Sequence, residues 1–254
     1  MRRTIVIPTC LGLLLSIASA GRGLTPAGPD PAALLRASDR ARGAAAASAG
    51  MSWSLNVVTK DGDESSEAAY TVKVRGDDAL AEVVSPARQR GEKILFNDRT
   101  LWFSKPGLRK PVSISPRQKL MGDAANGDIA STRYARDYDG EVVGEETVNG
   151  VPSWRLELKA RARNVTYDRI RYWISKRDRL GVRAEFLTLA GEAFKTADIS
   201  YDNAMRIGAE TFPFVSAMVI RDSLNTRRET VLRYQTPREE PHAASLFNVN
   251  NLAR

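Results

Sequence analysis

The feature that most constrains this chain is the alternation of apolar and polar residues between Trp53 and Tyr234. Tyr70, Val72 and Val74, for example, are separated by polar side chains. A period of two places every second side chain on the same face of a strand. With turns such as 61–64 between the strands, the pattern predicts a mainly β fold, a meandering sandwich or barrel of about ten or eleven antiparallel strands. The expected strands are 53–57, 70–74, 79–85, 94–96, 101–103, 154–158, 170–174, 180–189, 193–201, 212–221 and 229–235.

The alternation fails from Ser115 to Tyr138, where a helix is expected instead. Pro116 opens a short basic stretch, a turn at Asn126-Gly127 follows, and Asp128 can cap a helix that runs on through Tyr134. A helical insertion in a β meander would cover an open mouth or one face of a half-open barrel.

A second helix is expected at 31–42, ahead of the β region. Asp30 is a good N-cap, Pro31 suits the first helical position, and Gly43 can end the helix. The small residues 44–50 would link this helix to the body. The alternative is that residues 21–50 form a frayed leader.

The first twenty residues have the pattern of a cleavable signal peptide. Arg2 and Arg3 precede an apolar run, and a small-x-small site, 18–20, precedes Gly21. We therefore expect export by the general secretory route, with no membrane-spanning segment in the mature chain. Cys10 lies inside the apolar run, too early for lipidation. The expected organisation is a signal peptide (1–20), a helix and linker (21–50) and one β domain (51–254).

Little of the usual catalytic equipment is present. The chain has one cysteine and one histidine, His242, which is expected in a solvated tail. A Ser-His-Asp triad, a cysteine nucleophile and a zinc site are therefore disfavoured. We predict no enzyme activity, no metal and no cofactor. One alternative stays open, because a glycan hydrolase needs only two placed acids. The acids that cluster in one region are Asp123, Asp128, Asp137, Asp139, Glu141, Glu145 and Glu146.

The chain is basic, and loss of Arg2 and Arg3 lowers its net charge from +8 to +6. In an exported protein, this charge favours an anionic lipid surface or an acidic partner protein over nucleic acid. The basic pairs that would form such a docking surface, or else solvated strand faces, are Arg161/Arg163, Arg169/Arg171 and Arg227/Arg228.

The large apolar side chains on the inward strand faces are candidates to line a ligand cavity, with ordinary core packing as the alternative. Among the four tryptophans, Trp53 and Trp154 lie on apolar faces, whereas Trp102 and Trp173 are expected at a rim or interface. The candidate lining residues are Trp53, Leu55, Tyr70, Val72, Phe96, Trp154, Leu156, Tyr172 and Phe186.

A set of short phrases, in matching order, resembles the LolA-like family of periplasmic carriers, the outer-membrane lipoprotein-sorting proteins. The phrases are Leu101–Pro106, Arg109–Ser115, Asn126–Ala130, the residues Tyr134, Asp137 and Tyr138, and Arg169–Ile174. The resemblance runs from about Met51 to the C-terminus. It implies a half-open antiparallel barrel with a helical lid and an apolar cavity. It also implies a periplasmic location and transport of lipoproteins or other lipids between the inner and outer membranes. The phrases look closest to a branch that accompanies exporters of the resistance-nodulation-division (RND) type.

The predicted function is therefore that of a monomeric periplasmic carrier of acyl chains. An acyl chain of about sixteen carbons costs roughly 12 kcal/mol to expose to water, so it cannot cross an aqueous gap unaided. The free energy of the acyl chain in the site must be close to its free energy in the bilayer, because a carrier that bound the chain much more tightly would never release it. A marginally stable helix 31–42 could swing aside for loading. The alternative is a sensory or regulatory module of the same fold that binds a partner protein.

Overall fold

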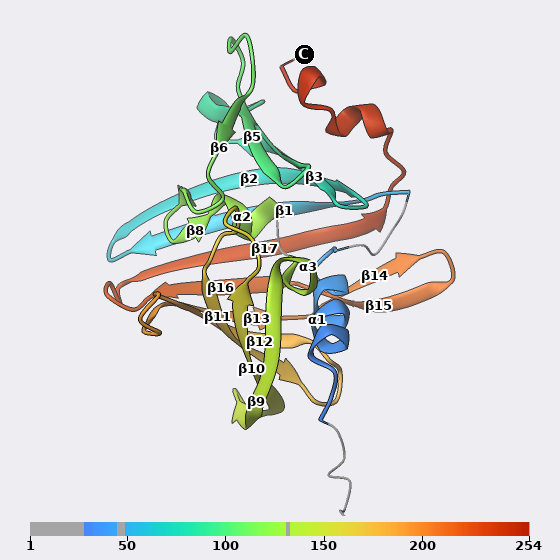
Figure 1. The fold of residues 1–254 in the computed structure, drawn as a ribbon. Coiled ribbons are helices and arrows are strands. Elements are labelled where there is room, and N and C mark those ends of the chain that lie inside the picture. Colours follow the sequence, from blue (N-terminus) through green and yellow to red (C-terminus); the bar gives the residue numbers. More distant parts are fainter. Residues whose placement is uncertain (1–27, 45–48, 131–132, 254) are drawn as a thin grey trace, which may run out of the picture.

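The fold is dominated by one curved antiparallel sheet, seen in a computed structural model that describes residues 28–44, 49–130 and 133–253 (Figure 1). Every pair of neighbouring strands in this sheet is antiparallel. Its thirteen strands are, in spatial order, β6 (Val112–Ile114), β5 (Thr100–Ser104), β4 (Lys93–Asn97), β3 (Asp78–Ser85), β2 (Glu64–Arg75), β1 (Met51–Asp61), β17 (Arg228–Glu239), β16 (Ala217–Asp222), β13 (Ala193–Ser200), β12 (Gly181–Leu187), β11 (Arg169–Ser175), β10 (Val151–Ala160) and β9 (Tyr138–Val148).

The topology confirms the mainly β, half-open architecture. Most connections are hairpins, and β1 pairs with β17, so the first and last strands meet at the centre of the sheet. The two ends of the strand order, β6 and β9, are not paired with each other in the described residues. The turn at Asp61–Glu64 lies between β1 and β2, as expected, and Gly62 adopts a positive φ of 61° there.

The described strands differ from the expected ones in several places, which include the unpredicted edge strand β6. The single strand expected at 212–221 is two strands, because β15 (Glu210–Phe214) pairs with β14 (Asn203–Ile207) in a separate hairpin. This hairpin projects from one side of the sheet (Figure 1). The sequence pattern also missed β9, the long strand at the edge of the sheet.

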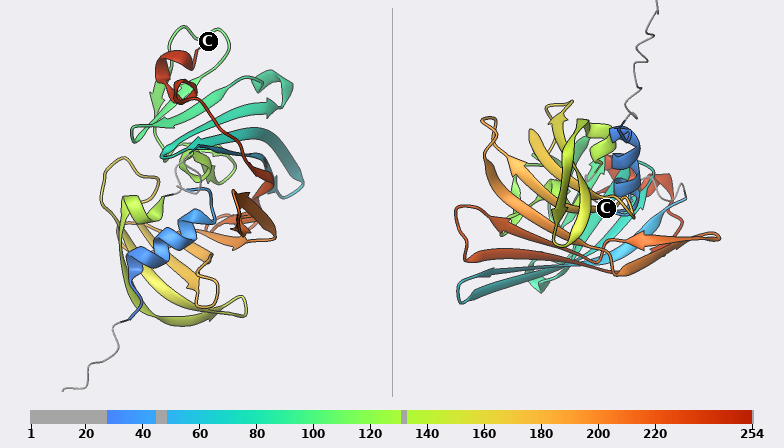
Figure 2. Two further views of the ribbon diagram at one scale, coloured as in Figure 1. Left: turned by 90° about the vertical axis from the view of Figure 1, so that its right-hand side faces the viewer. Right: turned by 90° about the horizontal axis from the view of Figure 1, so that it is seen from below.

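Helix α1 (Pro31–Arg40) confirms the expected N-terminal helix and lies on the concave side of the sheet (Figure 2). The carboxylate of Asp30 accepts hydrogen bonds from the backbone N–H groups of Ala32 and Ala33, at 3.0 and 3.2 Å. Leu34 and Leu35 are buried beneath the helix. The helix contacts β9 and α3 (Tyr134–Asp137). It therefore helps to cover the sheet rather than standing apart as a frayed leader.

The region from Ser115 to Tyr138 holds two short helices, not the single capped helix expected. They are α2 (Asn126–Ala130) and α3, and α2 follows the small hairpin β7 (Lys119–Met121) and β8 (Ala124–Ala125). Asp128 lies within the first turn of α2, so it is not the cap. Its carboxylate instead accepts the backbone N–H of Ala125 at 2.8 Å, which fixes the start of the helix.

Apolar residues pack on both faces of the sheet. The main cluster fills the concave side, beneath the helices. A smaller cluster on the other face joins Leu80 and Leu95 to Phe247 and Leu252 of the C-terminal segment. That segment forms two 3₁₀ turns, η2 (Ala244–Phe247) and η3 (Val249–Asn251), beside β3 and β4.

The expectation that His242 lies in a solvated tail is wrong. Its Nε2 lies 2.9 Å from Oγ of Ser52, and its backbone N–H donates to the carbonyl of Ala49 at 3.0 Å. The residue is partly buried, and its ring makes an edge-to-face contact with that of Phe247, with centroids 6.1 Å apart.

The expected signal peptide, 1–20, and most of the expected linker, 45–48, lie outside the described residues. Among the helices of the described part of the chain, none is long and apolar enough to cross a membrane.

Candidate functional site

The candidate lining residues all belong to the concave side of the sheet. Eight of them are buried members of the main apolar cluster, and Trp154, near one end of β10, is partly buried against it. Burial of this kind is also the mark of ordinary core packing, so their role in binding a ligand stays a prediction. The eight buried residues are Trp53, Leu55, Tyr70, Val72, Phe96, Leu156, Tyr172 and Phe186.

The interior beneath the helices is closely filled by side chains. Two spaces there have volumes of only about 20 Å³ each. Such a space holds about one water molecule, whereas pockets for ligands of drug size measure about 300–1,000 Å³. In the part of the chain that the structure describes, neither of these two spaces can hold an acyl chain until side chains or helices move, and we call this arrangement the closed state.

A polar cluster lies between α1 and the sheet. Oγ of Ser38 is 2.6 Å from the hydroxyl of Tyr172 on β11, and both groups are buried. Oδ2 of Asp39 accepts the backbone N–H of Ala135 at 2.7 Å, which ties α1 to α3. Burial raises the pKa of Asp39 to about 6, even though this hydrogen bond lowers it.

Arg42 extends this polar cluster just beyond the C-terminal end of α1. Its guanidinium carbon lies 5.0 Å from the centre of the Tyr134 ring. Tyr134 in turn makes an edge-to-face contact with Tyr172, with ring centroids 5.1 Å apart. A cationic side chain is thus enclosed in the apolar interior among aromatic rings.

Ser38, Asp39 and Arg42 were not among the predicted site residues, although their spacing is a signal in the sequence. Together with Leu34 and Leu35 they recur at intervals of three and four residues. That spacing places them on one face of a helix, so the face that buries the leucines also buries these polar groups. The apolar edge of the helix, Leu34 and Leu35, does not by itself indicate that polar residues are buried on the same face.

A second polar cluster fastens α2 to the sheet. The hydroxyl of Tyr167 donates to the carboxylate of Asp128, 2.9 Å from each oxygen. Nζ of Lys195 donates to the carbonyl of Asp123 at 2.8 Å and lies 3.4 Å from Oδ2 of Asp128. Tyr167 also stacks on Phe186 at a centroid distance of 3.8 Å.

Two of the seven acids considered for the hydrolase alternative, Asp128 and Asp137, have separate structural contacts. Asp128 holds the start of α2 and the hydroxyl of Tyr167, whereas Asp137 forms an ion pair with Arg136 at 2.7 Å. Asp128 thus helps to hold α2 in place, whereas Asp137 pairs with its neighbour Arg136 within α3.

The outward-facing tryptophans are more enclosed than the sequence suggested. Trp173 is buried, and its Nε1 donates to the carboxylate of Glu146 at 3.0 Å. It lies on the expected outer face, but ion-pairing side chains around it cover the ring, so its placement at an open rim is wrong. Trp102 faces away from Leu101 and Phe103, as expected, and packs against the smaller apolar cluster.

Comparison with known proteins identifies the class of fold. A LolA superfamily protein from Nitrosomonas europaea is 26% identical, with a TM-score of 0.75 over 87% of this chain and 98% of that chain. A second similar structure is that of a "putative outer membrane lipoprotein-sorting protein domain" from Vibrio parahaemolyticus. It is 20% identical, with a TM-score of 0.72 over 88% of this chain and 98% of that chain. A DUF1329 family protein from Desulfovibrio piger has the same identity and TM-score, over 88% and 100%. The curved sheet and its covering helices are therefore a LolA-like fold.

A protein-family model with the description "-like: Uncharacterized protein" matches residues 75–254. No curated protein matches the chain. The chain belongs to the family that this model describes, and its fold is LolA-like, as the sequence phrases indicated.

Proposed function

We propose that this protein is a periplasmic carrier that binds the acyl chains of lipids or lipoproteins and moves them between membranes. The observation that carries the proposal is the continuous apolar cluster on the concave side of the sheet, which is covered by short helices instead of by further strands. A half-open sheet with a removable cover can admit a long chain from the side. The LolA-like fold supports the same role.

Binding requires that the cover move, because the interior is closed in this structure. Helix α1 is the natural moving part, since its main contacts are with β9 and the short α3, with single polar contacts to Tyr172 on β11 and Glu210 on β15. When α1 lifts, Leu34 and Leu35 leave the cluster and expose its apolar surface. A site whose own side chains fill it when empty also binds less tightly, because part of the hydrophobic gain is already present without ligand. Such a site can release its load.

The location and partners of the carrier form part of the proposal. The signal-peptide pattern of residues 1–20 supports export to the periplasm. The branch of the family that the sequence phrases resemble supports a partnership with an RND-type exporter of the inner membrane. We assign no catalytic step to the protein.

A disulfide that fastens α1 to β9 tests the proposal directly. A Cβ built on Gly140 would lie 3.7 Å from Cβ of Pro31, inside the range of about 3.5–4.5 Å that disulfides require. The new Cβ would come within 3.1 Å of methyl groups of Leu35 and Leu158, which are the ends of flexible side chains and can shift. The double variant Pro31→Cys/Gly140→Cys, prepared from Gly21 onward so that Cys10 is absent, carries no other cysteine.

The measurement is uptake of labelled palmitoyl phospholipid from vesicles, with native mass spectrometry to count bound lipid. The oxidised double variant should take up little lipid, and reduction should restore uptake to the level of the unaltered protein. The two single variants, treated in the same way, control for the substitutions themselves. Equal uptake by the oxidised and reduced forms would show that α1 is not the cover. Absence of uptake by the unaltered protein would reject the carrier function itself.

A further inference from the structure

In the described part of the chain, the buried arginine at the end of α1 forms no ion pair, although it interacts with the carboxyl of Asp39 and with the hydroxyls of Tyr134 and Tyr172. Within the described residues no carboxylate lies within ion-pair distance of Arg42, and its Nη1 has no hydrogen-bond partner, although its side chain is only 8% exposed. A buried cation without an ion pair is costly, and a native interior normally satisfies such a group. The position therefore suits a ligand that completes the contact.

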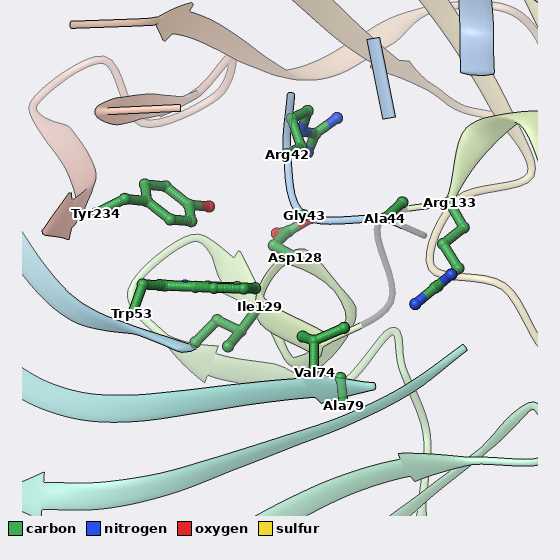
Figure 3. Close-up of a pocket in the computed structure, with 10 residues that line it drawn as sticks. All are labelled: Arg42, Gly43, Ala44, Trp53, Val74, Ala79, Asp128, Ile129, Arg133 and Tyr234. Carbon is green, nitrogen blue, oxygen red and sulfur yellow. The ribbon is translucent and has the colours of Figure 1, made fainter. Parts of the chain in front are cut away.

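A second donor without a partner belongs to another residue that lines the same space. Nε1 of Trp53, on β1, is buried and makes no hydrogen bond to any described residue. Arg42 and Trp53 both line one of the two small interior spaces, together with Gly43 and Tyr234 (Figure 3). At Gly43, which has a φ of 96°, an added Cβ would lie 2.9 Å from the Trp53 ring. The segment after α1 thus packs directly on this indole.

The other charged groups beside this space already have partners. Arg133 forms an ion pair with Asp77 and donates to the carbonyl of Gly76. The carboxylate of Asp128 interacts with Tyr167 and Lys195. Among the residues that line this space, the buried groups without a hydrogen-bond partner are therefore two N–H donors, one of them cationic, which favours an anion. The Oδ1 atom of Asp39, which does not line the space, also lacks a hydrogen-bond partner in the described residues and interacts with Arg42, so an anion must compete with this carboxyl.

Apolar side chains continue from this space into the main cluster. Val74, Ala79 and Ile129 line it beside the two donors (Figure 3), and all three belong to the apolar cluster. Burial raises the pKa of Tyr234 to about 12, so its side chain stays neutral at this site. One end of the site is thus polar and cationic, and the rest is apolar.

We propose that the ligand is an anionic acyl lipid, whose carboxylate or phosphate head accepts hydrogen bonds from Nη1 of Arg42 and Nε1 of Trp53 while its chain lies along the apolar cluster. This inference rests on the carrier function and adds the class of cargo. It favours a free fatty acid or an acidic phospholipid over an uncharged acyl chain.

The test compares ligands that differ only in the charge of the head. Binding of palmitic acid is measured against methyl palmitate, and binding of dipalmitoyl phosphatidic acid against dipalmitoylglycerol, at mildly alkaline pH. The protein should prefer at least one acid over its uncharged counterpart by about tenfold or more. Preference for palmitic acid alone would identify a fatty acid as the source of the anion, and preference for phosphatidic acid alone a phospholipid.

Two substitutions separate the head-group contact from the apolar contact. Arg42→Gln and Trp53→Phe should each reduce the preference for the acid several-fold and leave binding of the uncharged lipid nearly unchanged. Trp53→Phe keeps an aromatic ring in the core, so the preference for the acid can still be measured in this variant if Arg42→Gln folds poorly. Arg40→Gln is the matched control, because Arg40 lies on the same helix but pairs with Glu210 at the surface.

Equal binding of charged and uncharged lipids by the unaltered protein would overturn this inference and leave the carrier function intact. A preference for the acid that survives both Arg42→Gln and Trp53→Phe would also overturn it. If neither the charged nor the uncharged lipids bind, the carrier function fails as well, so the two failures are distinguishable.

Discussion

Ser38 and Tyr172 share a buried hydrogen bond of 2.6 Å, although 134 positions separate them in the chain. Ser38 lies on the inner face of α1, and Tyr172 lies on β11 at the floor of the concave side. This contact links the cover of the site to its floor. Its strength therefore bears on how readily the closed state opens.

Replacement of Tyr172 by Phe should loosen α1. The substitution removes one buried hydrogen bond, which typically contributes about 1 kcal/mol, and leaves the hydroxyl of Ser38 without this partner. We expect the free energy of unfolding to fall by about 1–2 kcal/mol. Amide exchange in α1 and lipid uptake should both become faster. Urea titration and hydrogen exchange measure the two effects.

Tyr201→Phe is the control for this prediction. The hydroxyl of Tyr201 donates to the carbonyl of Gly181 at 2.9 Å and does not hold α1. This variant should lose a similar amount of stability and leave amide exchange in α1 unchanged. Equal acceleration of exchange in both variants would mean that the Ser38–Tyr172 contact has no special role in holding the helix.

Gly181→Ala should disturb the same contact from the side of the sheet. A Cβ at Gly181 would lie 1.6 Å from the hydroxyl oxygen of Tyr172 and 2.8 Å from Oγ of Ser38. Tyr172 is fully buried, so its ring cannot simply move aside. Overpacking of this kind costs about 1–3 kcal/mol. Thermal unfolding should show the loss; Gly150→Ala, where an added Cβ meets nothing within 4 Å although φ is 77°, would show only the backbone cost.

Much of the fold could be predicted from the sequence, because alternation reports which face of a strand is buried. Tyr70, Val72 and Leu156 lie on the concave side as expected. The edge strand β9 was missed because its residues include several acids and glycines and few large apolar side chains. One side of this strand meets α1, where an added Cβ at Gly140 would press on Leu35, so small residues suffice there.

The site was less predictable, because its polar contacts join distant parts of the chain. No local pattern pairs Ser38 with Tyr172, and none shows that Trp53 directs its ring beneath Gly43. Trp173 is a case in which the position of the side chain was predictable and its burial was not. Its face was predicted correctly, but its burial depends on Glu146 from a neighbouring hairpin, which alternation alone does not place.

Phe247→Ala should destabilise the outer face of the sheet without affecting lipid binding. Phe247 is buried against Leu80 and Leu95, on the side opposite the proposed site. Truncation of a buried Phe costs about 3–5 kcal/mol. We expect a corresponding fall in the free energy of unfolding and more binding of a hydrophobic dye at the uncovered patch. If the variant is folded but takes up less lipid, the C-terminal segment contributes to the site after all.

Stability of the closed state should depend on pH through Asp39. The folded protein raises the pKa of this carboxyl from 3.8 to about 6, chiefly by burying it. Between these two values the folded state binds more protons than the unfolded state, so the free energy of unfolding must fall as the pH rises through this window. Above about pH 6, burial of the ionised carboxylate lowers the free energy of unfolding by roughly 3 kcal/mol. Below about pH 4 this destabilisation is absent.

Asp39→Asn should remove this pH dependence. The amide can still accept the backbone N–H of Ala135 through its oxygen, but it carries no charge to bury. The variant should therefore be more stable than the unaltered protein at pH 7, and the difference should shrink as the pH is lowered from about 6 towards 4. Urea titrations at a series of pH values measure the difference. A constant difference across this range would show that the pKa of Asp39 is the same in the folded and unfolded states. Its charge would then be balanced within the polar cluster.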